Sequence, residues 1–228
     1  MATNIRDGYM SPQVWVAKRE QKVIEVLDRL VPARVEYAEN IFAGEKYLEN
    51  GMVKREYALL TMVICEGEGT ERKQVRFNFS PDNFFALRRE CEPSVYAGRS
   101  YRKAFIKRNC NNGELKIRAV TITIEQYQKD REGNIKTSKD GKPIVAEYPW
   151  FIGISEETGI ADETGEKFAG KKTKVQSFIK MSSDEYQSMI DSTCRYIDVF
   201  AMAFGVPLLR EKAKIAQRKR EEYERKNH

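Results

Sequence analysis

One strand-to-helix unit occurs twice in this chain, and the repeat constrains the fold more than any other feature. In the first copy, residues 74–79 alternate apolar and polar side chains as a half-buried strand does. Ser80-Pro81-Asp82 then supplies an N-cap, a proline at the first helical position and an acid near the positive end of the helix dipole. The second copy follows 102 residues later (179 − 77), and its aligned pairs are Phe77 with Ile179, Phe79 with Met181, Ser80 with Ser182, and Phe84 with Tyr186.

The second copy predicts its helix most clearly. Apolar residues from Tyr186 to Phe204 follow three-and-four spacing, and Ser182 and Glu185 form a Ser-x-x-Glu capping box at the start. Gly205 and Pro207 predict the end of this helix. The tail at 210–228 is helix-prone and highly charged, so we expect it to extend into solvent or to lie on a partner.

Further strands are predicted ahead of each unit. Residues 57–65 form a dense apolar run, while residues 115–127 and 144–155 predict a long hairpin joined by a polar, glycine-containing turn. The acidic stretch at 156–166 is expected to be a surface loop. For residues 11–30 the pattern favours a helix, with a short edge strand at 13–17 as the alternative.

These elements predict an α+β fold of two antiparallel sheets, each followed by a helix, in an internally duplicated arrangement. The expected divisions are an N-terminal helical or edge segment (1–33), a first sheet-helix half (34–98), a second half (99–209) and the charged tail (210–228).

Composition excludes several classes of function. The single histidine is His228, the last residue, and the four cysteines (Cys65, Cys91, Cys110 and Cys194) form no CxxC pair. We therefore expect no catalytic site, metal or cofactor, and buried reduced thiols. The chain lacks an apolar run long enough to span a membrane, and its start lacks the apolar core of a signal peptide, which predicts a cytoplasmic protein.

Positive charge is concentrated in two segments. Residues 210–228 carry eight Lys or Arg against four Glu, residues 99–118 carry seven against one, and the whole chain has a net charge of +6. The rest of the chain is therefore mildly acidic. Two basic segments on an acidic body favour a polyanionic partner, although ordinary solvated charge would give the same pattern.

The repeated sequences FNFSPDNFFAL and IKMSSDEYQSM, with the long hairpin and the basic segments, resemble the whirly and PC4-like family of single-stranded DNA-binding proteins. The resemblance concerns the topology of residues 55–205. It implies a pseudo-two-fold fold that holds unpaired strands on its β surfaces, often as a homo-oligomer.

Binding of single strands without sequence preference needs cations for phosphates and aromatic faces for bases. The segments that interleave both kinds of residue predict the contacts, with solvated cations and a core Trp150 as the alternative. The candidates are Arg72, Arg76, Arg99, Tyr101, Arg102, Lys103, Lys107, Arg108, Lys116, Arg118, Tyr127, Trp150, Lys171, Lys172 and Lys174.

The favoured function is therefore non-catalytic binding of single-stranded DNA or RNA, as an accessory to DNA replication, repair, recombination or transfer. One alternative is a protein-interaction module that binds no nucleic acid. A second is a Mg²⁺-dependent nuclease, because Pro81-Asp82 and Glu114-Leu115-Lys116 match the short acidic elements of such enzymes.

Overall fold

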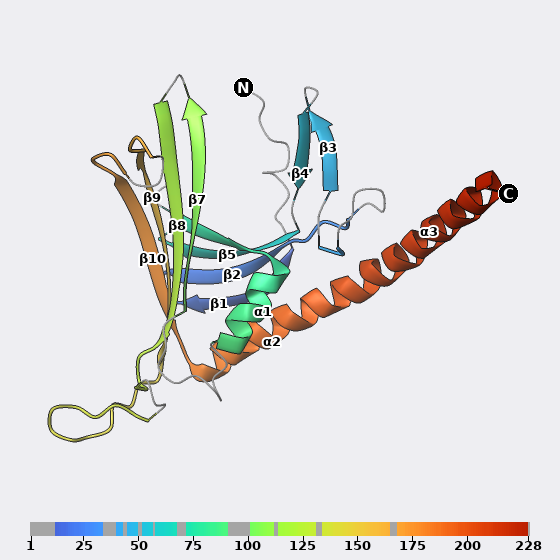
Figure 1. The fold of residues 1–228 in the computed structure, drawn as a ribbon. Helices are drawn as coiled ribbons and strands as arrows, with labels where there is room; N and C mark the ends of the chain where they lie inside the picture. The colour runs from blue at the N-terminus through green and yellow to red at the C-terminus, as the bar shows by residue number, and fades with distance from the viewer. Residues whose placement is uncertain are drawn as a thin grey trace.

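The computed structural model describes residues 12–33, 40–42, 45–49, 52–56, 58–67, 72–90, 101–111, 114–130, 134–164 and 168–227. Two four-stranded antiparallel sheets form the body, with the strands of one running across those of the other (Figure 1). The first sheet has the order β1 (Gln13–Arg19), β2 (Lys22–Arg29), β5 (Leu59–Glu66) and β6 (Lys73–Phe79). The second has the order β10 (Thr173–Met181), β9 (Trp150–Ile160), β8 (Glu114–Gln126) and β7 (Tyr101–Asn111).

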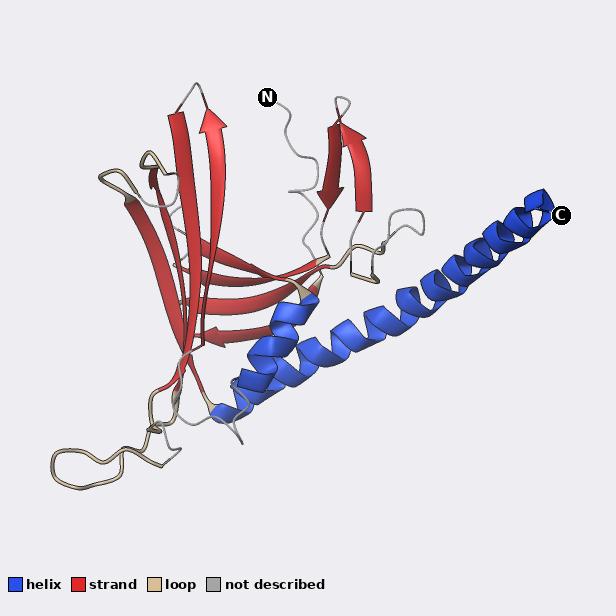
Figure 2. Cartoon of the chain, viewed as in Figure 1, coloured by secondary structure: helices blue, strands red, loops and turns tan. Residues whose placement is uncertain are grey.

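The last strand of each sheet leads directly into a helix. Helix α1 (Pro81–Glu90) follows β6, and α2 (Ser183–Phe200) follows β10. Helix α2 continues through a π-helical segment, η3 (Ala201–Gly205), into α3 (Val206–Asn227), which projects away from the sheets (Figure 2). A small separate hairpin is formed by β3 (Glu45–Glu49) and β4 (Met52–Glu56).

The predicted α+β class and duplicated arrangement are confirmed. Each half is a four-stranded antiparallel meander whose last strand enters a helix. Side chains that the 102-residue shift aligns are buried in both copies. The strand and helix of each unit therefore bury equivalent positions. These pairs are Phe77 with Ile179, Phe79 with Met181, Phe84 with Tyr186, and Leu87 with Met189.

The predicted helix starts are also confirmed. Ser182 accepts a hydrogen bond from the backbone amide of Glu185, and the Glu185 carboxylate accepts one from the amide of Ser182, so the capping box is complete. At α1, Ser80 Oγ accepts from the amide of Asn83 at 3.3 Å. Caps of this kind satisfy amides that have no partner within the helix.

The helix predicted for residues 11–30 is wrong. This segment forms the hairpin of β1 and β2, with β1 at the edge of the first sheet, as the alternative prediction held. Glu20 has φ 49° at the turn, and Ile24 and Val26 are fully buried on one face of β2. Burial along β2 follows a period of two, which is the period of a strand. The helical spacing in this segment is the weaker pattern.

The predicted end of the helix at Gly205 and Pro207 is also wrong, because the helix continues through η3 into α3. Proline has no amide hydrogen to donate, and a wider π turn accommodates this loss without ending the helix. Gly205 allows close packing here, since a Cβ on it would lie 3.0 Å from Cγ2 of Ile41.

The long hairpin is confirmed, with two changes of boundary. Its partner strand β9 starts at Trp150 rather than at residue 144, and it extends to Ile160 through part of the predicted acidic loop. The described residues 127–130 and 134–149 belong to the connection, in which Lys129 pairs with Ile135 and Thr137 with Pro143. The basic segment after residue 99 contains a strand, β7, that pairs with β8 along its whole length.

The core lies where the two sheets meet α1 and α2. The indole of Trp150 stacks on the ring of Tyr186 with centroids 3.8 Å apart and planes 5° from parallel. Cys65 and Cys194 are buried free thiols, as predicted for them. Among the helices in the described part of the chain, none is both long enough and apolar enough to cross a membrane.

Candidate nucleic-acid interface

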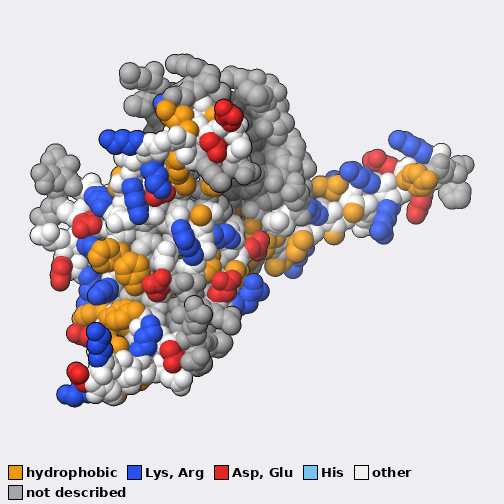
Figure 3. Space-filling model, turned by 60° about the vertical axis from the view of Figure 1, so that its left-hand side comes forward, with side chains coloured by type: hydrophobic (Ala, Val, Ile, Leu, Met, Phe, Trp, Pro, Cys, Tyr) orange, Lys and Arg blue, Asp and Glu red, His pale blue; other side chains and the backbone are white. Residues whose placement is uncertain are grey.

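A groove of about 410 Å³ lies on the face of the second sheet that points away from the core. All four strands of that sheet contribute to it. Figure 3, in which this side of the molecule is turned forward, shows hydrophobic side chains next to Lys and Arg. The lining residues that bear on binding are Arg102, Thr123, Glu125, Phe151, Lys174 and Phe178.

Two phenylalanines form the apolar part of the groove. The rings of Phe151 on β9 and Phe178 on β10 are stacked, with centroids 5.3 Å apart and planes at 27°. Phe178 is 45% exposed, although it lies on a strand whose alternate residues are buried. Exposed aromatic rings on a sheet are the surfaces on which unpaired bases stack.

Gly153 makes this arrangement of rings fit. It pairs with Phe178 in the register of β9 and β10, and a Cβ on it would lie only 2.9 Å from Cε1 of Phe151. The ring of Phe151 therefore occupies the space over Gly153, beside Phe178. Any larger residue at position 153 would push that ring away from its present place.

Cations surround the phenylalanine pair. Arg102 on β7 and Lys174 on β10 are exposed and line the groove from its two opposite edge strands. Nζ of Lys22, from the start of β2, lies 4.1 Å from the centre of the Phe178 ring and donates to the Phe178 carbonyl at 3.1 Å. Glu125 also lines the groove, and its carboxylate offsets part of the positive charge of Arg102 and Lys174.

Lys22 also belongs to a junction between the two sheets. Its ammonium lies 3.3 Å from Oε1 of Glu66, and Glu66 Oε2 accepts a hydrogen bond from the Ser177 hydroxyl at 2.7 Å. The bond from Ser177 and the nearby charge of Lys22 lower the pKa of Glu66, against the effect of burial. The start of β2 and the end of β5 are thereby fixed to β10, next to Phe178.

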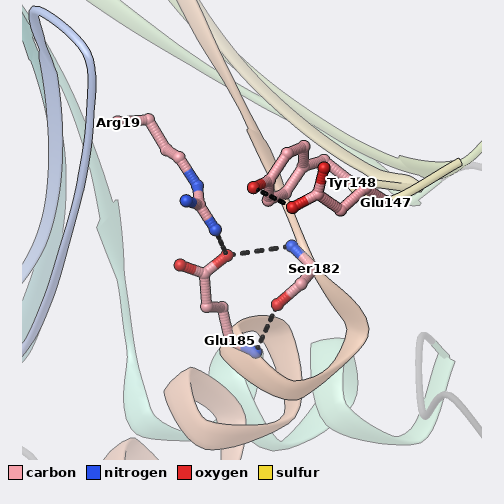
Figure 4. A network of polar contacts seen from close by, with 5 residues as sticks. All are labelled: Arg19, Glu147, Tyr148, Ser182 and Glu185. Atoms are coloured by element: carbon pink, nitrogen blue, oxygen red, sulfur yellow. Dashed lines mark hydrogen bonds and ion pairs between the residues drawn. The ribbon is translucent and has the colours of Figure 1, made fainter.

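A second polar network holds the point where β10 passes into α2 (Figure 4). Oε2 of Glu185 lies 2.7 Å from Nη2 of Arg19 and 2.9 Å from the amide of Ser182. The Arg19 guanidinium also lies 4.0 Å from the centre of the Tyr148 ring, and Glu147 accepts a hydrogen bond from the Tyr148 hydroxyl. β1, the β8–β9 connection and α2 therefore meet at one place.

Arg102 and Lys174 are the predicted cations that line the groove. Lys171 is exposed just before β10. Tyr127 is half-buried, and the centre of its ring lies 5.5 Å from Nζ of Lys180. Lys116 is exposed farther along β8. Lys103 lies on β7 and donates to Oδ1 of Asn83, which joins it to α1.

Two predicted cations are in ion pairs. Nε and Nη2 of Arg118 lie 2.7 and 2.6 Å from the two oxygens of Glu156, and this bond raises the pKa of the guanidinium. Lys172 Nζ lies 2.8 Å from Oε2 of Glu157. Part of their charge is thus already balanced within the protein.

The prediction that Tyr101 and Trp150 stack on bases is wrong. Tyr101 is 5% exposed and Trp150 is 1% exposed, and both belong to the core. Rings enclosed in this way present no face to a ligand. Trp150 and Phe151 are consecutive residues of β9, so their side chains point to opposite faces of the sheet. The tryptophan points toward the core and the phenylalanine toward the groove.

The remaining predicted residues are not brought into the groove. Arg72, just before β6, and Arg76, on β6 of the first sheet, are exposed. Nη2 of Arg76 donates to Oε1 of Gln74 at 2.7 Å. Lys107 and Arg108 lie on β7, but their side chains fall outside the described part of the structure. Arg99 lies wholly outside the described residues.

The two acidic elements of a nuclease do not come together. Asn83, next to Asp82, contacts Lys103, which pairs with Ile122 on β8. Glu114 lies eight residues farther along β8, a distance of about 26 Å at the usual rise of a strand. Within the described residues, no cluster of three or more His, Cys, Asp or Glu could hold a metal ion.

Sequence reasoning missed Phe151 and Phe178. Their signal was an aromatic ring at a position where an alternating strand should present polar residues, as in Gln176-Phe178-Lys180. Only the strand register shows that Phe178 lies beside the ring of Phe151.

Comparison with known proteins assigns no family. No protein-family model matches the chain, and no curated protein matches its sequence. One solved structure, of the plant transcriptional regulator PBF-2, is similar with a TM-score of 0.47 and 10% sequence identity, over 88% of this chain and 87% of that chain.

Proposed function

We propose that this protein binds single-stranded nucleic acid in the groove of the second sheet. The observation that carries the proposal is the stacked pair of half-buried Phe151 and exposed Phe178 in a groove that Arg102 and Lys174 also line. The role is non-catalytic. It fits an accessory of DNA replication, repair, recombination or transfer that holds strands while other proteins act on them.

The groove supplies both kinds of contact that such binding needs, rings for bases and cations for phosphates. Arg102, Thr123, Gly153 and Phe178 form one row across the sheet, which spans three strand spacings or about 14 Å. Bases would stack on the phenylalanines, with roughly 1 to 3 kcal/mol for each stacked base. Phosphates would contact Arg102, Lys174 and the neighbouring Lys171, and release counterions.

Stacking on an exposed ring requires a base that is not paired, so single strands should bind in preference to duplexes. Stacking on a ring and contacts to phosphates do not distinguish one base from another, which predicts little dependence on base sequence.

The test is fluorescence anisotropy with labelled single- and double-stranded oligonucleotides over a series of salt concentrations. Affinity should fall steeply with salt, and the Arg102→Ala plus Lys174→Ala double variant should bind more weakly. The slope of log K against log salt should become shallower by about 0.7 for each phosphate that the variant no longer neutralises. Lys139→Ala plus Lys142→Ala, which removes two exposed lysines of the β8–β9 connection, is the matched control.

Stacking is tested separately with Phe178→Leu, which keeps an apolar side chain and removes the ring. Affinity should fall at least fivefold while the salt slope stays unchanged, because no cation is removed. A flat salt dependence in the wild-type protein, or equal binding of single strands and duplexes, would overturn the proposal. No binding of oligonucleotides at any length would favour the protein-interaction module.

A further inference from the structure

The exposed large apolar side chains of α3 follow a heptad repeat. Val206 and Leu209 are 44% and 60% exposed, and Tyr223 is 71% exposed. The spacing of three and four residues continues through Ala213 and Ala216 to Tyr223. In heptad notation, Val206, Ala213 and Arg220 take position a, and Leu209, Ala216 and Tyr223 take position d.

From this seam we infer that the protein pairs with a second copy of itself through a parallel, two-stranded coiled coil of α3. Valine at position a with leucine at position d, as in Val206 and Leu209, favours two strands. Helix α3 has 22 residues, a length of about 33 Å, and projects from the body as a single helix (Figure 1). Helices in proteins are stabilised mainly by packing of an apolar face, and a second helix would cover the apolar seam of α3.

The flanking charges select the parallel orientation. Positions g carry Lys212, Lys219 and Lys226, while positions e carry Arg210, Gln217 and Glu224. In an antiparallel pair position g faces g, so any overlap along most of α3 would set lysine against lysine. In a parallel pair position g faces e of the next heptad, which places Lys219 opposite Glu224 of the second copy and Lys212 opposite its Gln217.

Arg220 at position a adds to the same assignment. A single polar residue within an otherwise apolar seam weakens a coiled coil but fixes its register, because other registers bury the charge against apolar layers. With Arg220 aligned on its own copy, the two guanidinium groups lie near the end of the seam, where Glu221 and Glu224 are close in sequence.

Sedimentation equilibrium of the full chain without nucleic acid tests the pairing. The wild-type protein should have twice its chain mass of 26.4 kDa at tens of micromolar. Val206→Ala plus Leu209→Ala should raise the dissociation constant at least tenfold, and Leu208→Ala, one position off the seam, should not. Alanine preserves helix propensity, so far-UV circular dichroism should show folded variants. A monomeric wild-type protein, a trimer or tetramer, or equal effects of Leu208→Ala would overturn the inference.

Charge reversal tests the orientation. Lys219→Glu should weaken a parallel pair, because it places glutamate opposite Glu224 of the second copy. Lys219→Glu plus Glu224→Lys should restore the wild-type mass. In an antiparallel pair position g faces g, so Lys219 does not meet Glu224 and the second change would not restore the pairing. Because no oligonucleotide is present, the outcome is independent of the function proposed above.

Discussion

Arg19 and Glu185 are 166 residues apart in the chain, yet their side chains form an ion pair with 2.7 Å between Nη2 and Oε2. Arg19 ends β1 in the first sheet, and Glu185 is the capping-box residue of α2 behind the second sheet. The N-terminal hairpin thus completes the cap of a helix that belongs to the other half of the molecule. Folding of the two halves is therefore coupled at this contact.

The Arg19–Glu185 pair predicts a loss of stability in acid. Burial acts to raise the pKa of Glu185, but hydrogen bonds from Ser182 and Arg19 outweigh it, so the folded pKa lies below the ordinary 4.5. The carboxylate therefore stabilises the fold above pH 4.5, and this contribution disappears as pH falls through the folded pKa. Glu185→Gln should lower the free energy of unfolding by about 1 kcal/mol at pH 7.

Urea denaturation at pH 7, 5 and 3 measures this effect. The difference between wild type and Glu185→Gln should shrink toward pH 3 as the Glu185 carboxylate takes up a proton. Glu163→Gln, at an exposed position, is the control and should change little. A constant difference at all three pH values would contradict the prediction.

The hydrogen bond between Tyr196 and Asp28 predicts a change at high pH. The Tyr196 hydroxyl donates to Oδ2 of Asp28 at 2.7 Å, and burial together with this bond raises the pKa of Tyr196 to about 12. The unfolded tyrosine titrates near pH 10, so the bond stabilises the fold below pH 10, and its contribution disappears between pH 10 and 12. Tyr196→Phe should lower the free energy of unfolding by about 1 kcal/mol at pH 8.

The same variant should unfold with a weaker dependence on pH than the wild type between pH 10 and 12, as followed by circular dichroism in urea. Tyr127→Phe removes a hydroxyl from a half-buried tyrosine outside this contact and serves for comparison. Parallel pH curves for Tyr196→Phe and wild type would show that the bond to Asp28 does not contribute.

Gly153→Ala should weaken binding of oligonucleotides without unfolding the protein. The new Cβ would lie 2.9 Å from Cε1 of Phe151, and the ring can respond by moving outward because it lies at the surface of the groove. Loss of one stacked base would reduce affinity about fivefold or more in anisotropy titrations. Gly170→Ala is the matched control, since a Cβ there meets nothing within 4 Å. Unchanged affinity in Gly153→Ala would place the bases elsewhere.

Trp150→Ala should affect stability rather than the binding surface. The indole is buried against Tyr186, so its truncation should lower the free energy of unfolding by about 3 to 5 kcal/mol in urea denaturation. Val145→Ala, at a site that is 81% exposed, should change it by less than about 0.5 kcal/mol. Any loss of oligonucleotide binding in Trp150→Ala should match the fraction of unfolded protein.

Local signals predicted the parts of the fold that are decided locally. The cap at Ser182 involves residues three apart, and the burial of Phe77 and Phe79 follows directly from alternation. At residues 13–29 local spacing was ambiguous, and pairing of β2 with β5, from Arg29 with Leu59 to Lys22 with Glu66, decided for strands. Strand β7 was hidden because basic residues occupy positions where a buried strand would show apolar ones.

The candidate site depended on contacts that no local pattern contains. The charge of Arg118 is balanced by Glu156, which is 38 residues away in sequence but close to it in the sheet. Phe151 and Phe178 are adjacent only because β9 and β10 pair in one register. Composition could predict that cations and aromatic rings are present in this region, and register decides which of them share a face.

The π-helical segment η3 sets the rotational phase of α3 relative to the body. Successive residues of an α-helix differ by about 100° around the axis, so deletion of one residue from Ala201–Gly205 would turn every later side chain by about that angle. Composition and length would hardly change, yet Leu209 would face a different direction in space. The direction in which each side chain of α3 points from the body therefore depends on these five residues between α2 and α3.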